Sequence, residues 1–238
     1  MKRGDSDRPL IGLTRPDGGD EAAFQAASLA LRLSDARVIP LTARTPYEDV
    51  ALDGLMLGGG ADVHPPLFET APKAAYPYDL AREVMELGWL SRAWAQDMPA
   101  LGVCRGAQLM NVGAGGALHM DLAAAFQESR YPDHWLEQIW FRKPVRIEPG
   151  SRLAAILGPE PLHVNSIHNQ AVERLGEGLT ISARETNGAV QAIEAPGRRF
   201  WLGVQFHPEF MFYRRRFRRL FEAFVAAARD FRRRRGPA

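Results

Sequence analysis

The chain has 238 residues, 46% of them hydrophobic and 24% charged, with a formal net charge of +2. No apolar run approaches the ~20 residues of a membrane-spanning helix, and the apolar run at residues 10–13 is too short for a secretory signal. A single cysteine excludes an internal disulfide and is typical of a reducing compartment. We therefore expect a globular, cytoplasmic protein that does not enter a membrane.

Short apolar runs alternate with longer amphipathic stretches, a pattern typical of β-α-β units around a mostly parallel sheet. In chain order, we expect a strand at 9–13, a helix at 20–33, strands at 37–41 and 54–57, a helix at 79–95, a strand at 100–103 and a helix at 106–114. Further strands are expected at 139–147, 162–164, 179–183, 189–194 and 200–206. The segments 65–77 and 127–134 show no period and are expected to be mobile loops. The pattern predicts an α/β fold in which residues 1–238 form a single domain.

The C-terminal segment is strongly basic. Residues 214–235 contain ten arginines and two acidic residues, so the rest of the chain carries 20 basic and 26 acidic residues. Apolar residues recur there at helical spacing, at Phe217, Leu220, Phe221, Phe224, Val225 and Ala228. We expect a closing helix with a solvated face and a frayed basic tail at about 232–238. The alternative is that the arginines tether the protein to nucleic acid or to an anionic membrane, which the acidic body opposes.

Cys104 lies where an apolar strand runs into a helix, and Gly102 and Gly106 flank it two residues away on either side. This spacing is typical of a sharp, strained turn that exposes a nucleophile. The unpaired N–H groups and the dipole of a helix N-terminus favour the thiolate form. A structural cysteine at a strand end would explain neither glycine. We therefore predict that Cys104 is a nucleophile.

A thiolate nucleophile needs a proton carrier for the leaving amine, and the carrier needs an orienting partner. His207 and Glu209 stand two residues apart, and side chains two apart share a face of an extended chain. Pro208 between them favours an extended conformation of His207. We predict a triad of Cys104, His207 and Glu209, although in isolation the His-Pro-Glu tripeptide is more typical of a surface turn.

A glycine-rich turn, Gly58-Gly59-Gly60, follows the strand expected at 54–57. Its spacing matches neither of the common phosphate-binding patterns. A backbone without Cβ can present an N–H at close range to a tetrahedral oxyanion, so we assign the oxyanion hole to the amides of Gly60 and Arg105. A plain tight turn is the alternative. The six histidines show no metal-ligand spacing, so we expect neither a metal nor another cofactor.

Five segments together resemble the class I glutamine amidotransferase superfamily, and most closely its γ-glutamyl-γ-aminobutyrate hydrolase branch, peptidase family C26. They occur in the family's order, at residues 58–65, 102–112, 115–122, 164–172 and 203–209. The resemblance implies a three-layer α/β sandwich with a flavodoxin-like core and a central, mostly parallel sheet. It also implies a Cys-His-Glu triad that cleaves γ-glutamyl amides, and a role in amine or polyamine catabolism.

The same resemblance implies which residues hold the glutamyl group. Gln108, one helical turn after the nucleophile, is implied to contact it. The segment Ser166 to Gln170 is implied to line the same pocket with Asn169, and His168 there is a binding or structural residue rather than a second base. Ser166 and His168 could instead satisfy backbone groups in a turn.

Three positions depart from the branch: Phe68 replaces a usual tyrosine, Phe206 a tryptophan and Gln191 a glutamate, and the last could change a charge near the pocket. His119 has no assigned role, and His134 either covers the site or is simply exposed. The amine half of the substrate does not follow from the sequence and could be γ-aminobutyrate or a polyamine derivative. The oligomeric state does not follow either, and the chain could form a homodimer.

The leading hypothesis is a cysteine hydrolase of small γ-glutamyl amines. The Cys104 thiolate attacks the γ-glutamyl carbonyl, His207 protonates the departing amine, and water then hydrolyses the thioester. The alternative is a glutaminase subunit that hands ammonia to a partner synthetase. The chain shows no synthetase domain, and its segment 164–172 favours the free-standing hydrolase. We expect a small γ-glutamyl substrate as the partner, and no nucleic acid.

Overall fold

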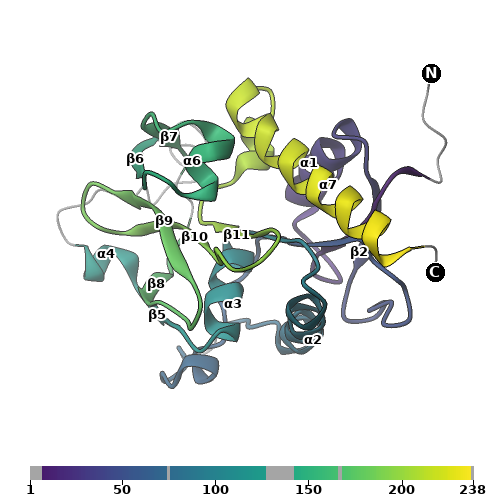
Figure 1. Ribbon diagram of the computed structural model, residues 1–238. Coiled ribbons are helices and arrows are strands. Elements are labelled where there is room, and N and C mark those ends of the chain that lie inside the picture. The colour runs from purple at the N-terminus through teal and green to yellow at the C-terminus, as the bar shows by residue number, and fades with distance from the viewer. Residues whose placement is uncertain (1–6, 74–75, 127–141, 166–167, 237–238) are drawn as a thin grey trace.

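The computed structural model describes residues 7–73, 76–126, 142–165 and 168–236, and a nine-stranded sheet forms their centre (Figure 1). Its parallel half contains, as neighbours in this order, β2 (Arg37–Leu41), β1 (Leu10–Thr14), β3 (Gly54–Leu57), β4 (Ala100–Val103) and β11 (Trp201–Val204). The sheet continues with antiparallel strands, β10 (Val190–Glu194), β9 (Thr180–Glu185), β6 (Lys143–Ile147) and β7 (Leu162–Val164). The predicted α/β fold is confirmed.

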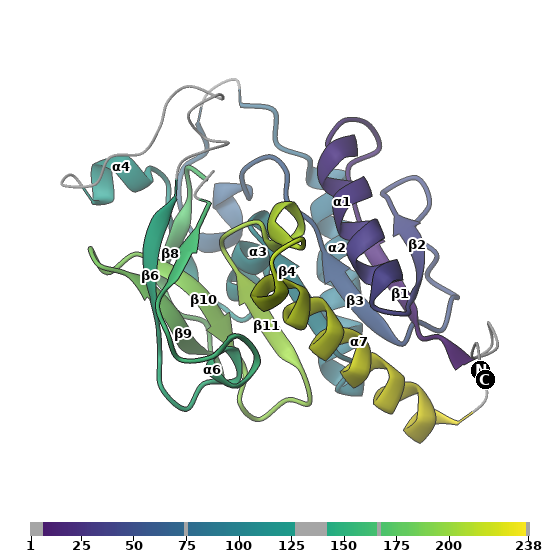
Figure 2. The ribbon, with the colours of Figure 1, turned by 90° about the horizontal axis from the view of Figure 1, so that it is seen from above.

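Helices cover both faces of the parallel half, as the view from above shows (Figure 2). One face is covered by α1 (Glu21–Leu33) and α7 (Arg215–Arg235), and the other by α2 (Leu80–Gln96) and α3 (Arg105–Gly113). Because both faces are covered, β3, β4 and β11 are buried at every position. This is why these strands are continuous apolar runs rather than alternating ones.

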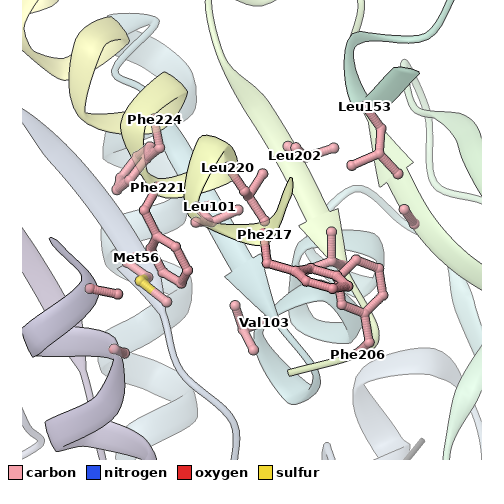
Figure 3. Packing of buried hydrophobic residues seen from close by; sticks show 14 of the residues in the cluster. Met56, Leu101, Val103, Leu153, Leu202, Phe206, Phe217, Leu220, Phe221 and Phe224 are labelled. Carbon is pink, nitrogen blue, oxygen red and sulfur yellow. The ribbon is translucent and has the colours of Figure 1, made fainter. Parts of the chain in front are cut away.

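The core between α7 and the sheet is rich in aromatic side chains (Figure 3). Phe217, Leu220, Phe221 and Phe224 point from α7 toward the strands and are at most 2% exposed. Phe217 meets Phe206 with ring centroids 5.8 Å apart, just beyond the end of β11. The apolar face predicted for the closing helix is therefore confirmed, and it packs directly beneath the segment that leads to His207.

Six shorter elements complete the described part of the fold. They are η2 (Pro65–Phe68), β5 (Ala117–His119), α4 (Leu122–Ala125), α6 (Arg152–Leu157), β8 (Ala171–Arg174) and η3 (Pro208–Met211). β5 and β8 pair as a separate antiparallel ribbon. The prediction of a mobile loop is wrong for residues 65–68, because η2 buries Pro65 and Phe68. The loop predicted at 127–134 lies outside the described residues.

The basic C-terminus is helical through Arg235, so the frayed tail predicted from residue 232 is wrong for residues 232–235. Asp53, which is fully buried, accepts from Arg232 at 3.1 Å and from Arg235 at 2.9 Å. Its Oδ2 also accepts from the backbone N–H of Leu10 at 2.7 Å. Charge pairing with a buried carboxylate therefore fixes the last turn of α7 against β1. None of the described helices is long and apolar enough to cross a membrane.

The anchor of α7 yields a stability prediction. Replacing Asp53 with alanine leaves the Leu10 N–H and two guanidinium groups without this acceptor. We expect the free energy of unfolding in urea to fall by about 2–4 kcal/mol. The control is Asp230→Ala, which breaks an exposed pair to Arg233 and should change it by less than about 0.5 kcal/mol. Equal effects of the two substitutions would contradict the anchor.

Candidate active site

Cys104 occupies the junction between β4 and α3 with φ 52° and ψ −110°, outside the regions that non-glycine residues favour. Its backbone N–H donates to Val204 O at 2.8 Å, which ties the turn to β11. The flanking glycines are required for space: a Cβ on Gly102 would lie 2.7 Å from the Gly106 carbonyl carbon, and one on Gly106 would collide with the Leu57 carbonyl. The strained turn predicted from the glycine spacing is therefore present.

His207 and Glu209 are in contact: His207 Nδ1 lies 2.7 Å from Glu209 Oε1, and both side chains are buried. The predicted reason for this contact is wrong. The segment is not extended, because Pro208 opens η3 and Glu209 lies in the first turn of that 3₁₀ helix. Proline fits the first helical position because its fixed φ suits the helix and no N–H is needed there. The carboxylate therefore reaches back to the histidine that precedes the helix.

The imidazole of His207 also forms a hydrogen bond with the thiol of Cys104. Burial opposes protonation of this imidazole, but the charges of Glu209 and Cys104 outweigh it, so the pKa of His207 lies well above its ordinary value. Gly59 lies against the pair, since a Cβ on it would be 3.1 Å from His207 Cε1 and 3.8 Å from Cys104 Cβ. The structure thus brings the three predicted residues together and favours an imidazolium beside the sulfur.

Asn165 fixes the backbone of His207, a role that the sequence did not reveal. Its Oδ1 accepts from the His207 N–H at 2.8 Å, and its Nδ2 donates to the His207 carbonyl at 3.2 Å. Asn165 is 3% exposed, so these are bonds made away from water. The segment 164–172, which carries the family resemblance, contains Asn165, but its spacing to His207 in the sequence does not indicate the contact.

A chain of buried side-chain amides runs up to the sulfur. Gln170 pairs with the backbone of Val63 through both its amide oxygen (2.8 Å) and its amide nitrogen (3.0 Å). Gln108 Nε2 donates to Gln170 O at 2.7 Å and to Gln205 Oε1 at 3.1 Å. Gln205 Nε2 in turn lies 3.6 Å from Cys104 Sγ. Sequence reasoning missed Gln205, although it falls within the segment 203–209.

These hydrogen bonds bear on two residues that were predicted to contact the substrate, Gln170 and Gln108. Gln170 is fully buried and its side-chain amide is bonded to the backbone of Val63, so the protein itself holds this side chain; its assignment to the substrate pocket stays a prediction. Gln108 donates both of its amide N–H groups to the protein, so that it can contact a ligand only as a hydrogen-bond acceptor, through its carbonyl oxygen. Its predicted contact with the glutamyl group therefore requires a hydrogen-bond donor on the substrate, such as an ammonium group.

The glycine-rich turn lies over a buried cluster of four charges. Glu86 binds Arg105 through Oε2 and Arg82 through Oε1, the latter at 2.8 Å, and Glu83 lies 3.3 Å from Arg105. All four residues are at most 3% exposed. Burial raises the pKa of Glu86, but the charges of Arg105 and Arg82 outweigh it and hold that pKa below its ordinary value. Charged residues of an amphipathic helix carry no sequence signal for such burial.

The predicted oxyanion amides flank this cluster. Arg105 begins α3 directly after the nucleophile, and its side chain is held by Glu86 and Glu83. Gly60 has φ 142°, and a Cβ on it would lie 2.5 Å from Arg82 Nη1, so only glycine fits there. Gly59 rather than Gly60 lies against the Cys104 side chain. The assignment of the hole to the Gly60 and Arg105 amides stays a prediction.

His168 is held in a polar cluster of its own. Its Nδ1 lies 2.9 Å from Gln170 O, and its Nε2 lies 3.3 Å from the amide nitrogen of Gln191. Burial lowers the pKa of His168 to about 4, so the ring is neutral at physiological pH. Gln191 Nε2 also donates to Glu185 Oε1 at 2.6 Å. A glutamate at position 191 would repel Glu185, which gives the departure at Gln191 a structural reason.

The remaining predicted positions contribute less. Asn169 is exposed, and its carbonyl accepts from the N–H of Leu122 at 2.7 Å. His119 packs edge-on against Phe126 with ring centroids 5.6 Å apart. Ser166 and His134 lie outside the described residues. Within the described ranges, no group of three or more His, Cys, Asp or Glu side chains could hold a metal ion.

The strand-turn-helix junction at Cys104, the doubly covered sheet and the adjacent His-Glu pair define a class I glutamine amidotransferase fold. The solved structure of a glutamine amidotransferase from Thermotoga maritima matches it with a TM-score of 0.59, over 85% of this chain and 76% of that one, at 15% identity. The sequence pattern of Peptidase C26 matches residues 36–209. The chain therefore belongs to the peptidase C26 family, a branch of the class I glutamine amidotransferase superfamily.

Two relatives support this placement. The γ-glutamyl-γ-aminobutyrate hydrolase PuuD of Escherichia coli is 32% identical over 187 residues, which are 74% of this chain and 72% of that protein. A Mycobacterium tuberculosis protein whose name places it among the glutamine amidotransferases is 37% identical over 160 residues, or 67% of this chain. The chain spans about half of that relative, since the match covers 51% of it.

The close contact at Gly59 predicts a catalytic defect. In Gly59→Ala, the new methyl group pushes on His207 Cε1, and we expect kcat/KM to fall about 10- to 100-fold with little change in thermal stability. The matched control is Gly18→Ala, where a Cβ meets nothing within 4 Å, and its kcat/KM should equal that of the wild type. An unchanged kcat/KM in Gly59→Ala would contradict this prediction, because it would show that the imidazole of His207 accommodates the methyl group.

Proposed function

We propose that the protein hydrolyses the γ-glutamyl amide bond of small γ-glutamyl amines through a thioester on Cys104. The observation that carries the proposal is the arrangement of Cys104 on a strained turn, hydrogen bonded to an imidazole that Glu209 holds at 2.7 Å. The bond type is supported by the family and by the name of the Escherichia coli relative. Cys104, His207 and Glu209 are the nucleophile, the acid-base group and its orienter in this proposal.

In the first half-reaction, the Cys104 thiolate attacks the γ-carbonyl carbon, and the negative charge moves to the carbonyl oxygen. The amides of Gly60 and Arg105 donate to this oxyanion. As the C–N bond breaks, the His207 imidazolium gives its proton to the departing nitrogen, so that a neutral amine leaves and a thioester remains. The raised pKa of His207 supports this step, because it favours the protonated ring that donates to the leaving nitrogen.

In the second half-reaction, neutral His207 takes a proton from water as the oxygen attacks the thioester carbon. The C–S bond then breaks, glutamate is released, and the thiolate-imidazolium pair is restored. Glu209 keeps its hydrogen bond to Nδ1 throughout, so that Nε2 exchanges the proton. Gln108 offers its carbonyl oxygen, which suits the α-ammonium group of a glutamyl moiety.

A glutaminase that delivers ammonia to a synthetase is the second candidate. The name of the Mycobacterium tuberculosis relative favours it. The two functions differ in the leaving group and in the need for a partner protein. A nucleic-acid module is not favoured, because Arg216, Arg229, Arg232 and Arg235 hydrogen bond to the protein's own carbonyls and carboxylates.

The substrate class is tested with the purified protein alone and a panel of glutamine, γ-glutamyl-γ-aminobutyrate and γ-glutamyl polyamines. We expect turnover of one or more γ-glutamyl amines without any partner, and a loss of at least about 10⁴-fold in Cys104→Ser, because a serine hydroxyl is a far weaker nucleophile here. Turnover of glutamine alone, and only with a synthetase added, would favour the second candidate. Full activity of Cys104→Ser would rule out the mechanism.

The charge of Glu209 predicts the pH dependence. Its carboxylate raises the pKa of His207, so removing the charge in Glu209→Gln lowers that pKa. The protonated imidazole is needed to expel the amine, and we therefore expect the alkaline limb of kcat/KM to move about one pH unit or more toward lower pH. An imidazole titration by NMR should show the same direction. Glu222→Gln, on the exposed side of α7, is the control and should leave the profile in place.

A further inference from the structure

Gln205 lies beside the sulfur of Cys104, although nothing in the proposed mechanism uses it. Its Nε2 is 3.6 Å from Sγ, and the side chain is 3% exposed. β11 ends one residue earlier, at Val204, and the backbone N–H of Gln205 donates to Gln191 O at 2.9 Å. Gln205 is therefore tied to the neighbouring strand directly after the end of the central strand β11.

The orientation of this amide is fixed by its neighbours. Gln205 Oε1 accepts from Gln108 Nε2 at 3.1 Å, and Gln108 is itself tied to Gln170 O at 2.7 Å. The opposite orientation of the Gln205 amide would place two NH₂ groups face to face and turn a carbonyl oxygen toward the sulfur. Because the oxygen is anchored, the NH₂ group of Gln205 must face Cys104.

The sulfur thus lies between two donors of different kinds. His207 forms a hydrogen bond with it and gives up its proton during the reaction, whereas a primary amide keeps its protons at every pH at which the protein is folded. A donor that stays in place stabilises negative charge on the sulfur both before attack and when the thioester C–S bond breaks. A hydrogen bond to an ion is also stronger than one to a neutral group.

We propose that Gln205 is a further catalytic residue, whose side-chain N–H donates to the Cys104 sulfur and stabilises the thiolate, with Gln108 as the residue that orients it. The proposal rests on Cys104 being the nucleophile of the proposed function. It does not depend on which amine leaves.

The test is the pH dependence of Cys104 alkylation by iodoacetamide, followed by mass spectrometry. The chain has one cysteine, so the modified thiol is always Cys104. In Gln205→Met, which keeps the length of the side chain and removes the donor, we expect the alkylation midpoint to move about one pH unit higher. In Gln108→Met, the Gln205 amide loses its orienting partner, and we expect a smaller shift in the same direction.

Two further variants control for folding and charge. Gln25→Met removes an exposed amide on α1 and should leave the alkylation profile unchanged. Gln205→Glu retains the shape of the side chain but offers a carboxylate, and its midpoint should move further upward than that of Gln205→Met. Circular dichroism reports whether each variant is folded.

An unchanged alkylation midpoint in folded Gln205→Met and Gln205→Glu would overturn the proposal. Alkylation needs no substrate, so this outcome is distinguishable from a failure of the proposed function. If no γ-glutamyl amide is turned over but the midpoint shifts as expected, the role of Gln205 stands and the substrate class is wrong.

Discussion

The structure depends on a buried, electrically neutral cluster of two arginines and two glutamates. Its centre is Glu86, which is fully buried and joins Arg82 of its own helix to Arg105, the first residue after Cys104. Thr14 of β1 donates to the same carboxylate, and Arg82 also donates to the carbonyl of Gly58. Removing one ion from such a cluster costs roughly 3–5 kcal/mol, because the remaining charges stay buried without compensation. The cluster therefore ties α2, the start of α3 and the glycine-rich turn into one unit.

This unit explains how the strained backbone at Cys104 is maintained. A non-glycine residue at φ 52° and ψ −110° is costly and persists only where the surroundings determine it from several sides. The charge cluster holds the residue after Cys104, the Val204 carbonyl holds its N–H, and Gly102 and Gly106 let β4 and α3 pack without intervening side chains. Apolar packing of α7 beneath β11 supports the same region from the opposite face (Figure 3). Cys104 is thus fixed by charge on one side of the sheet and by aromatic packing on the other.

The sequence was informative where local rules and tertiary structure agree. The strand-to-helix turn at Cys104 was predicted correctly because glycine spacing and apolar pattern are local properties. The contact between His207 and Glu209 was predicted, but through alternation along a strand, whereas Pro208 in fact begins a 3₁₀ helix. The burial of Glu86 could not be predicted, because charges on an amphipathic helix are solvated unless tertiary partners exist. The same limit made the end of α7 look like a frayed tail, since its acceptor, Asp53, is 179 residues away from Arg232 in sequence.

Charged side chains at the site have two kinds of hydrogen-bond partner, carboxylates and neutral amides. Arg105 is held by carboxylates, which suits a side chain that never changes its charge. At His207 and Cys104 neutral amides supplement one carboxylate: Glu209 holds the imidazole, Asn165 fixes the backbone of His207, and Gln205 faces the sulfur of Cys104. A further carboxylate beside the sulfur would disfavour the thiolate, and a further cation beside the imidazole would lower the pKa of that ring. An amide positions each group without either effect. The carboxylate of Glu209 supplies the charge that raises the pKa of His207 from outside the Cys104–His207 contact.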